Sequence, residues 1–165
     1  MARKLLILGA GQFGRMLREI AAQMHCFDRI DFLDDAASDA LGALSDCKML
    51  CGNFTDAVVA IGKPDVRLFW IEQLAEIGYN IPAIISHKAY IAPSAVIGDG
   101  SVIEPNATVQ TGSFIDKGCI VASGAVVRHN ATMQAGGCLD CNAVLLSGAV
   151  LPAQAKVPAL TVYAN

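Results

Sequence analysis

From Ile91 to Val157 a large aliphatic residue stands at every sixth position of the chain, without a gap. Four places after each one comes a small residue, and in nine of the twelve units Gly or Asn stands directly before that small residue. The aliphatic positions are Ile91, Ile97, Ile103, Val109, Ile115, Val121, Val127, Met133, Leu139, Leu145, Leu151 and Val157. A fixed six-residue period is the signature of a repeat architecture.

The repeat unit itself predicts a left-handed parallel β-helix. The aliphatic side chain fills the core of a three-sided column, and the small residue lets the backbone turn the corner. Gly or Asn sits where the corner needs a positive φ, which other residues adopt at a cost of roughly 1 kcal/mol. Three units make one coil, so the twelve units predict about four coils, stacked about 4.8 Å apart.

Charge and composition exclude two classes of partner. The formal net charge is −3 and no basic run occurs, so a nucleic-acid partner is not expected. The hydrophobic share is 54%, yet no apolar run approaches 18 residues, so no membrane span is expected. Arg3 and Lys4 before Leu5–Leu8 weakly imitate a signal peptide, but the run ends at Gly9 and is better explained as a strand. The expected compartment is therefore the cytoplasm.

The six cysteines are interpreted as reduced thiols. Cys138 and Cys141 have the C-x-x-C spacing of a metal knuckle, but they lie inside the hexad register and no second pair accompanies them. Zinc or redox chemistry is the less favoured alternative, and no bound metal is expected.

Residues 1–88 follow a different pattern, in which apolar strands alternate with helices. Strands are predicted at residues 4–8, 29–33, 58–62 and 81–85, and helical periodicity follows the first and the third. This order is typical of a parallel sheet with helices on its faces. We therefore expect an α/β, Rossmann-like half-domain over residues 1–88 and the β-helix over residues 89–165.

A G-x-G-x-x-G motif opens the first predicted helix. Its glycines are Gly9, Gly11 and Gly14, and Asp34 and Asp35 follow about 20 residues later. Such glycines let the backbone approach a phosphate at a helix N-terminus. About 88 residues is short for a complete NAD module, so the motif favours binding of a nucleotide diphosphate. NAD binding and a purely structural turn remain alternatives, as do solvated acids at Asp34 and Asp35.

This combination resembles the bacterial sugar O- and N-acyltransferases, a family of hexapeptide-repeat enzymes that includes sialic acid O-acetyltransferases and UDP-amino-sugar N-acetyltransferases. The similar segments are GAGQFGR at 9–15, FLDD at 32–35, AIG at 60–62 and ISHKAYIAPSA at 85–95. The resemblance implies an acetyl-CoA-dependent acetyl transfer to an amino or hydroxyl group of a nucleotide-linked sugar in surface-glycan synthesis. It also implies a homotrimer with acetyl-CoA in the groove between two subunits.

The resemblance assigns roles to individual residues. His129, in the stretch SGAVVRHN, matches the catalytic histidine, and Asn130 stands where relatives often carry an acid that orients the ring. Cys138, where many members have a second histidine, and Gly148 are weaker coenzyme-binding candidates. The implied sugar-nucleotide site comprises Gly9, Gly11, Phe13, Gly14, Asp34, Asp35 and Gly62.

The position and chemistry of His129 support the same role independently of the resemblance. The third place of a hexad points outward, and a neutral imidazole can accept the proton that an amine or hydroxyl loses when it attacks a thioester. An incidental surface histidine is the alternative. His87, in the linker, and His25, at a helix end, are better explained as structural residues.

Two other functions remain open at this stage. Relatives continue for further coils beyond the corresponding point, so a non-catalytic sugar-nucleotide-binding trimer with a shortened coenzyme site is one alternative. A metal-dependent hydratase would need several histidines, and the predicted helix holds one. Outward valines at positions 96, 102, 126, 144 and 150 are expected to support trimer packing.

Overall fold

The computed structural model describes residues 3–164 and consists of two compact units, one ending at Pro82 and the other starting at Ala83. The sequence placed this boundary at residues 88 and 89. The second unit starts earlier because β4 (Ile84–Ile85) pairs with β7 (Val102–Ile103), a strand of the β-helix.

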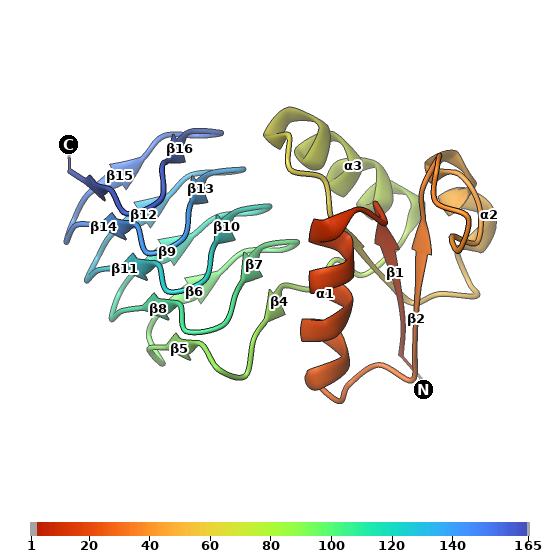
Figure 1. Cartoon of the computed structure of the whole chain (residues 1–165), viewed down its shortest axis with the longest axis horizontal. Helices are drawn as coiled ribbons and strands as arrows, with labels where there is room; N and C mark the ends of the chain where they lie inside the picture. Colours follow the sequence, from red (N-terminus) through yellow and green to blue (C-terminus); the bar gives the residue numbers. More distant parts are fainter. Residues whose placement is uncertain (1–2, 165) are drawn as a thin grey trace. The chain divides into compact units, whose positions relative to one another are not determined.

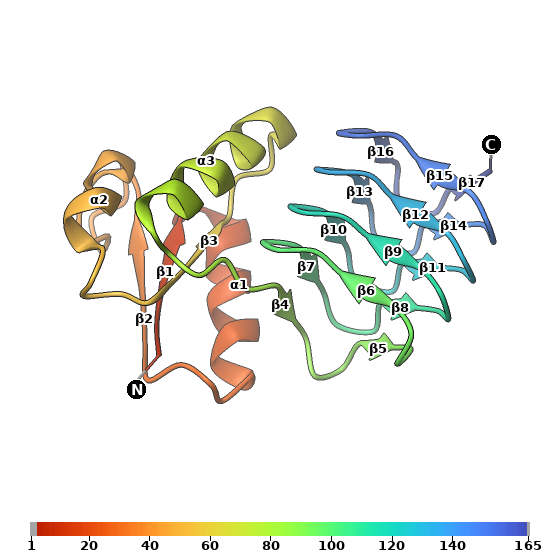
Figure 2. The same cartoon turned by 180° about the vertical axis from the view of Figure 1, so that it is seen from behind.

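The first unit is a three-stranded parallel sheet in the order β2-β1-β3. Its strands are β1 (Lys4–Leu8), β2 (Arg29–Leu33) and β3 (Asp56–Val59), and its helices are α1 (Gln12–Gln23), α2 (Cys47–Leu50) and α3 (Pro64–Ile77), with a 3-10 turn, η1, at Leu44–Asp46. Figures 1 and 2 show α1 and α3 on opposite faces of this sheet.

Both faces of the sheet are buried, which explains why β1 is apolar at successive positions. Leu6 and Leu8 belong to a core that includes Ile71 and Leu74 of α3. On the other side α1 buries Leu17 and Ile20. Helix α3 begins with proline in its first turn and ends at Gly78, whose φ of 109° only glycine adopts readily.

The prediction of a fourth strand of this sheet over residues 81–85 is wrong. After α3 the chain makes one parallel bridge, between Asp56 and Asn80, and then Ile84–Ile85 joins the β-helix instead. An apolar run of this length fits either sheet, so its sequence alone did not decide between them. The third strand, predicted at residues 58–62, begins two residues earlier and ends three residues earlier, at Asp56–Val59.

The second unit is a left-handed β-helix of about four turns, as predicted, with three parallel sheets as its sides (Figure 1). One side consists of β4, β7, β10 (Ile120–Val121), β13 (Cys138–Leu139) and β16 (Lys156–Val157). The second comprises β5 (Tyr90–Ile91), β8 (Thr108–Val109), β11 (Val126–Val127), β14 (Val144–Leu145) and β17 (Val162–Tyr163). The third comprises β6 (Val96–Ile97), β9 (Phe114–Ile115), β12 (Thr132–Met133) and β15 (Val150–Leu151).

The repeat positions have the environments that the period predicted. The aliphatic residues from Ile103 to Val157 are at most 2% exposed and form one continuous core. The corner positions have positive φ at every unit from Gly100 to Leu160, including the two where Gly or Asn is replaced, Gln154 and Leu160. The register also extends to Ile85 and Tyr163, which pack against the same core.

Five valines that precede an inward aliphatic were predicted to face outward, and the structure corrects this for Val102. Val96 is 53% exposed, and Val126, Val144 and Val150 are partly exposed, but Val102 is 1% exposed. Ile84 and Ile120, its neighbours on the same side, are also buried, so this place does not face solvent on the early strands of that side.

None of the helices within residues 3–164 is long and apolar enough to cross a lipid bilayer.

Candidate functional site

The first candidate site lies at the carboxyl ends of the three parallel strands of the first unit, where α/β sheets bind ligands. The loop after β1 contains Gly9, Gly11 and Gly14, the loop after β2 contains Asp34 and Asp35, and the loop after β3 contains Gly62. The structure therefore places the proposed glycines and acids in three loops at the same edge of the sheet, with Phe13 partly buried in the first turn of α1.

Two of the three glycines are required by packing. A Cβ on Gly14 would lie 2.0 Å from the carbonyl oxygen of Gly9, and one on Gly9 would lie 2.8 Å from that of Ala60. The loops after β1 and β3 are therefore in direct contact. Gly11, which caps α1, has no atom within 4 Å of its Cβ position. This open side of the loop is where a ligand phosphate could approach the helix N-terminus.

Asp34 holds the glycine loop in place through its carboxylate. One oxygen accepts the N–H of Ala10 at 2.8 Å, and the other accepts the N–H groups of Ala36 and Ala37, both at 2.9 Å. The bond from Ala10 does most to keep the pKa of Asp34 below its usual range. Asp35 is exposed and accepts the N–H of Leu44 at 2.9 Å. Both carboxylates thus organise loops around the site.

Three charged residues that the sequence analysis did not single out also shape this site. The buried Arg67 guanidinium donates to the carbonyl oxygens of Ile61 and Gly62, at 2.9 and 2.8 Å, and so fixes the loop after β3. Arg15 donates to Ala10 O at 3.0 Å and forms a two-bond ion pair with Asp39. Arg15 lies in the GAGQFGR segment, but Asp39 carries no local signal, since its partner is 24 residues away.

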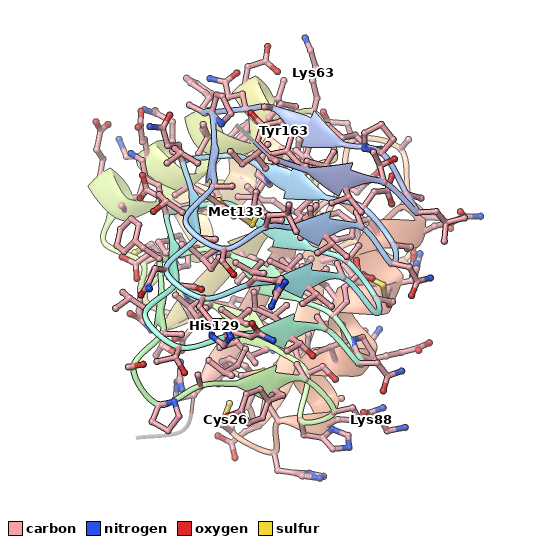
Figure 3. The ribbon with its side chains drawn as sticks, turned by 90° about the vertical axis from the view of Figure 1, so that its left-hand side faces the viewer. Cys26, Lys63, Lys88, His129, Met133 and Tyr163 are labelled. Atoms are coloured by element: carbon pink, nitrogen blue, oxygen red, sulfur yellow. The ribbon has the colours of Figure 1, made fainter. Side chains whose placement is uncertain are left out.

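The second candidate site is a corner of the β-helix, between β11 and β12, where His129 is located (Figure 3). Its side chain is exposed, as the third place of the hexad predicted. Within residues 3–164 no group hydrogen-bonds to the ring. The same place in the coils before and after holds Thr111 and Ser147.

Asn130 is part of the corner backbone rather than a partner of the ring. Its φ is 56°, its N–H donates to Thr111 O at 3.0 Å, and its amide oxygen lies against Gly112, 2.2 Å from where a Cβ would be. Asparagine suits this conformation because it tolerates the left-handed region. The side chain that follows the histidine therefore packs against the neighbouring coil.

Of the two coenzyme-binding candidates, one lies on this corner and one does not. The N–H of Gly148 donates to His129 O at 2.9 Å, and Gly148 lines a hollow together with Leu146, Ser147, Ala149 and Ala164. Cys138 lies in β13, on the side of the column opposite this corner. It is near the ion pair between Lys156 and Asp140, whose N–O distance is 2.8 Å.

The cysteines are free thiols in the structure, Cys138 and Cys141 included. Within residues 3–164 no group of three His, Cys, Asp or Glu side chains is arranged to hold a metal ion.

Sequence comparison identifies both parts of the chain. The pattern of the PglD N-terminal domain matches residues 4–74, and that of the bacterial transferase hexapeptide, with six repeats, matches residues 94–129. No curated protein matches the sequence.

Comparison with solved structures finds similar chains of nearly the same extent. The acetyltransferase domain of PglB from Neisseria gonorrhoeae is 30% identical, with a TM-score of 0.85, and the match covers 97% of this chain and 87% of that one. The same domain in complex with acetyl coenzyme A is 29% identical, with a TM-score of 0.81 and coverage of 98% and 88%. PerB from Caulobacter crescentus, in complex with CoA and GDP-perosamine, is 16% identical, has a TM-score of 0.59 over 94% and 91%, and shares the fold.

Proposed function

Since this chain belongs to the bacterial sugar acyltransferases that join a PglD-type N-terminal domain to a hexapeptide β-helix, we propose that it acetylates a nucleotide-linked sugar. The chain is an acyltransferase with acetyl-CoA as its co-substrate. The acceptor is an amino or hydroxyl group of the sugar, and the reaction takes place in the cytoplasm during surface-glycan synthesis. The observation that carries the proposal is the exposed His129 on a corner of the β-helix.

The first unit supplies the site for the nucleotide part of the substrate. The diphosphate lies against the open side of Gly11, where backbone N–H groups and the partial positive charge of the α1 N-terminus favour an anion. Asp34, through Ala10, and Arg67, through Gly62, hold the two flanking loops in shape before the ligand arrives. Because these loops are already fixed, binding does not need to order them.

The corner at His129 supplies the base. The acceptor nitrogen or oxygen attacks the thioester carbonyl, a new C–N or C–O bond forms, and the imidazole takes the proton that the acceptor loses. The carbonyl oxygen becomes an oxyanion, which then expels the CoA thiolate, and the thiolate takes up a proton. The thioester is already activated, so no covalent enzyme intermediate is needed.

A backbone amide is available to stabilise the oxyanion. Ser147 occupies the place of His129 one coil further on, and its N–H has no hydrogen-bond acceptor among the residues that the structure describes. Strands in adjacent coils lie about 4.8 Å apart, so the thioester carbonyl oxygen can face this amide while the attacking acceptor group lies beside the imidazole. Gly148, next in the chain, contributes to the hollow beside them.

Steady-state kinetics with acetyl-CoA and a panel of UDP- and GDP-linked amino and hydroxy sugars tests this proposal. His129→Ala should lower kcat by at least 100-fold, since general bases contribute about 10²- to 10⁴-fold. Thr111→Ala, at the same place one coil earlier, is the matched control and should retain activity. Equal turnover by His129→Ala and wild type would remove the histidine from the mechanism.

Calorimetry that detects sugar-nucleotide binding without acetyl-CoA binding would favour the non-catalytic alternative.

We also propose that the chain works as a homotrimer, with acetyl-CoA in the groove between two β-helices. Apolar side chains are exposed on two sides of the column, among them Tyr90, Val96 and Phe114, at 59%, 53% and 44%. Light scattering at micromolar concentration should give three times the mass of one chain, and Phe114→Glu should dissociate the assembly. A monomeric wild type would contradict this part of the proposal.

A further inference from the structure

The β-helix uses a repeated contact between neighbouring coils. Glu104, at the second place of its hexad, accepts hydrogen bonds from both the N–H and the hydroxyl of Ser123, at 2.9 and 2.8 Å. Gln134, also at a second place, accepts the N–H of Ala153 at 3.0 Å. In both pairs the donor lies 19 residues later, at the third place one coil further on. A glutamate or glutamine at the second place therefore reaches the backbone N–H of the third place one coil further on. Glu104 also reaches the side-chain hydroxyl there.

Gln110 occupies the same place on the corner that carries His129, and the residue 19 positions later is His129 itself. The amide oxygen of Gln110 is buried and has no hydrogen-bond partner among the described residues. Buried polar side-chain atoms are nearly always hydrogen-bonded, so an unpaired acceptor at this point requires an explanation. The backbone N–H of His129, the equivalent of the Ala153 donor, is not bonded to it either.

Gln110 has an unpaired acceptor oxygen, and a catalytic imidazole requires such an acceptor for one of its ring nitrogens. A general base must present one ring nitrogen without a proton, and the tautomer is set by the hydrogen bond that the other nitrogen donates. Asn130 cannot supply this acceptor, because its amide oxygen packs against Gly112 at the corner. The contact from the Ser123 hydroxyl to Glu104 shows that side chains in this relation can meet, and glutamine has the length of glutamate.

We propose that Gln110 is a positioning residue for His129. When the exposed imidazole turns toward it, the amide oxygen of Gln110, unpaired in the structure, accepts the Nδ1–H, so that Nε2 faces the acceptor group of the substrate. The inference rests on the proposed function, in which His129 is the base. Gln110 itself does not touch the reacting atoms. It fixes which nitrogen carries the proton and the direction in which the ring points.

The electrostatic setting of the pair is simple. The places flanking His129 in the coils before and after hold Gln110, Thr111, Gly112, Leu146, Ser147 and Gly148. None of these side chains ionises. Among the described residues of this corner of the β-helix, the one charged neighbour is Arg128, directly before His129 in the chain. A neutral acceptor orients the ring without attracting a second proton to it. A carboxylate in the same position would stabilise the imidazolium.

Imidazole ¹⁵N NMR of the free protein tests the pairing without any substrate. In wild type one tautomer of His129 should dominate. Gln110→Met, which keeps the chain length but removes the acceptor, should give a mixture of tautomers. Gln110→Glu should keep the dominant tautomer and raise the titration midpoint of His129 by about one pH unit. Gln134→Met, at the equivalent place on another corner, is the control and should leave the His129 signals unchanged.

Kinetics supply the second readout. Gln110→Met should lower kcat about 10-fold with both KM values unchanged, and Gln110→Glu should restore most of kcat with its acid limb moved to higher pH. The proposal would be overturned by a Gln110→Met variant that keeps the wild-type tautomer of His129 and a Gln110→Glu variant that keeps its wild-type midpoint. If the NMR changes appear but wild type shows no acetyl transfer, the pairing stands and the proposed function fails.

Discussion

The carboxylate of Asp34 accepts the backbone N–H of Ala10 at 2.8 Å and thereby joins the end of β2 to the glycine loop after β1. Two further N–H groups, from Ala36 and Ala37, bond to its other oxygen. Its role is therefore to shape the loops that surround the proposed diphosphate site. An acidic residue beside a phosphate would otherwise be unfavourable, but here its charge is directed into three backbone donors.

Asp34→Ala should destabilise the first unit by about 2–3 kcal/mol, because three N–H groups lose a charged acceptor. Asp35→Ala removes an acceptor for a single N–H on an exposed side chain and should cost less than about 1 kcal/mol. Urea unfolding followed by the fluorescence of Trp70, the single tryptophan, which lies in α3, reports this unit. Equal losses in the two variants would contradict the role assigned to Asp34.

Gly14→Ala and Gly11→Ala should separate folding from ligand binding. The Cβ at position 14 would lie 2.0 Å from a backbone oxygen, so we expect a loss of stability of about 3 kcal/mol. Position 11 is open and its φ is −68°, so alanine should change stability by less than about 1 kcal/mol. The added methyl group should nevertheless weaken binding of UDP or GDP, measured by calorimetry, because it occupies the side where the phosphate approaches. Unchanged affinity in Gly11→Ala would place the nucleotide elsewhere.

The β-helix could be predicted from the sequence because its determinants are local and periodic. Each inward aliphatic and each corner Gly or Asn is predicted from its own hexad, and the inward position of the same period extends to Ile85 and Tyr163. The strands Lys4–Leu8 and Arg29–Leu33 were predicted with the bounds that the structure gives, since turn residues enclose both apolar runs.

The features that could not be predicted depend on contacts between distant segments. Ile84–Ile85 was assigned to the wrong sheet because its partner strand, Val102–Ile103, is not visible from its own composition. A charged residue such as Arg67 in a helix is expected at the surface, yet Arg67 is buried and donates to the carbonyl oxygens of Ile61 and Gly62. Gln110 gives no signal until the coils are stacked and the 19-residue relation to His129 appears.

Acid should weaken the first unit partly through Asp56. Burial raises the pKa of this carboxyl, but hydrogen bonds from Arg3, Thr55 and Asn80 outweigh burial and hold the pKa below its usual value. A carboxyl with a lowered folded-state pKa stabilises the fold fully above the unfolded pKa, about 3.9, and the contribution is lost as pH falls through the folded value.

Asp56→Asn should therefore lower stability at pH 7 by about 2–3 kcal/mol, because the buried negative charge opposite the Arg3 guanidinium and one of its two acceptor oxygens are lost. Its stability should also fall less steeply than that of wild type between pH 5 and about pH 2. Urea midpoints from Trp70 fluorescence across this range provide the measurement. Parallel curves for the two proteins would show that Asp56 does not titrate as the structure implies.

Leu160 occupies a corner that suits asparagine better than leucine. Its φ is 60°, within a degree or so of the value at Asn106, and its side chain is 81% exposed, so no packing compensates the strain. Leu160→Asn should raise the stability of the β-helix by about 1 kcal/mol. Gly148→Ala provides the opposite change, since φ is 72° there and no atom lies within 4 Å of the Cβ position. It should cost about 1 kcal/mol through backbone strain alone. Thermal unfolding followed by circular dichroism should rank the proteins Leu160→Asn, wild type and Gly148→Ala, and the reverse order would show that corner conformation does not govern stability here.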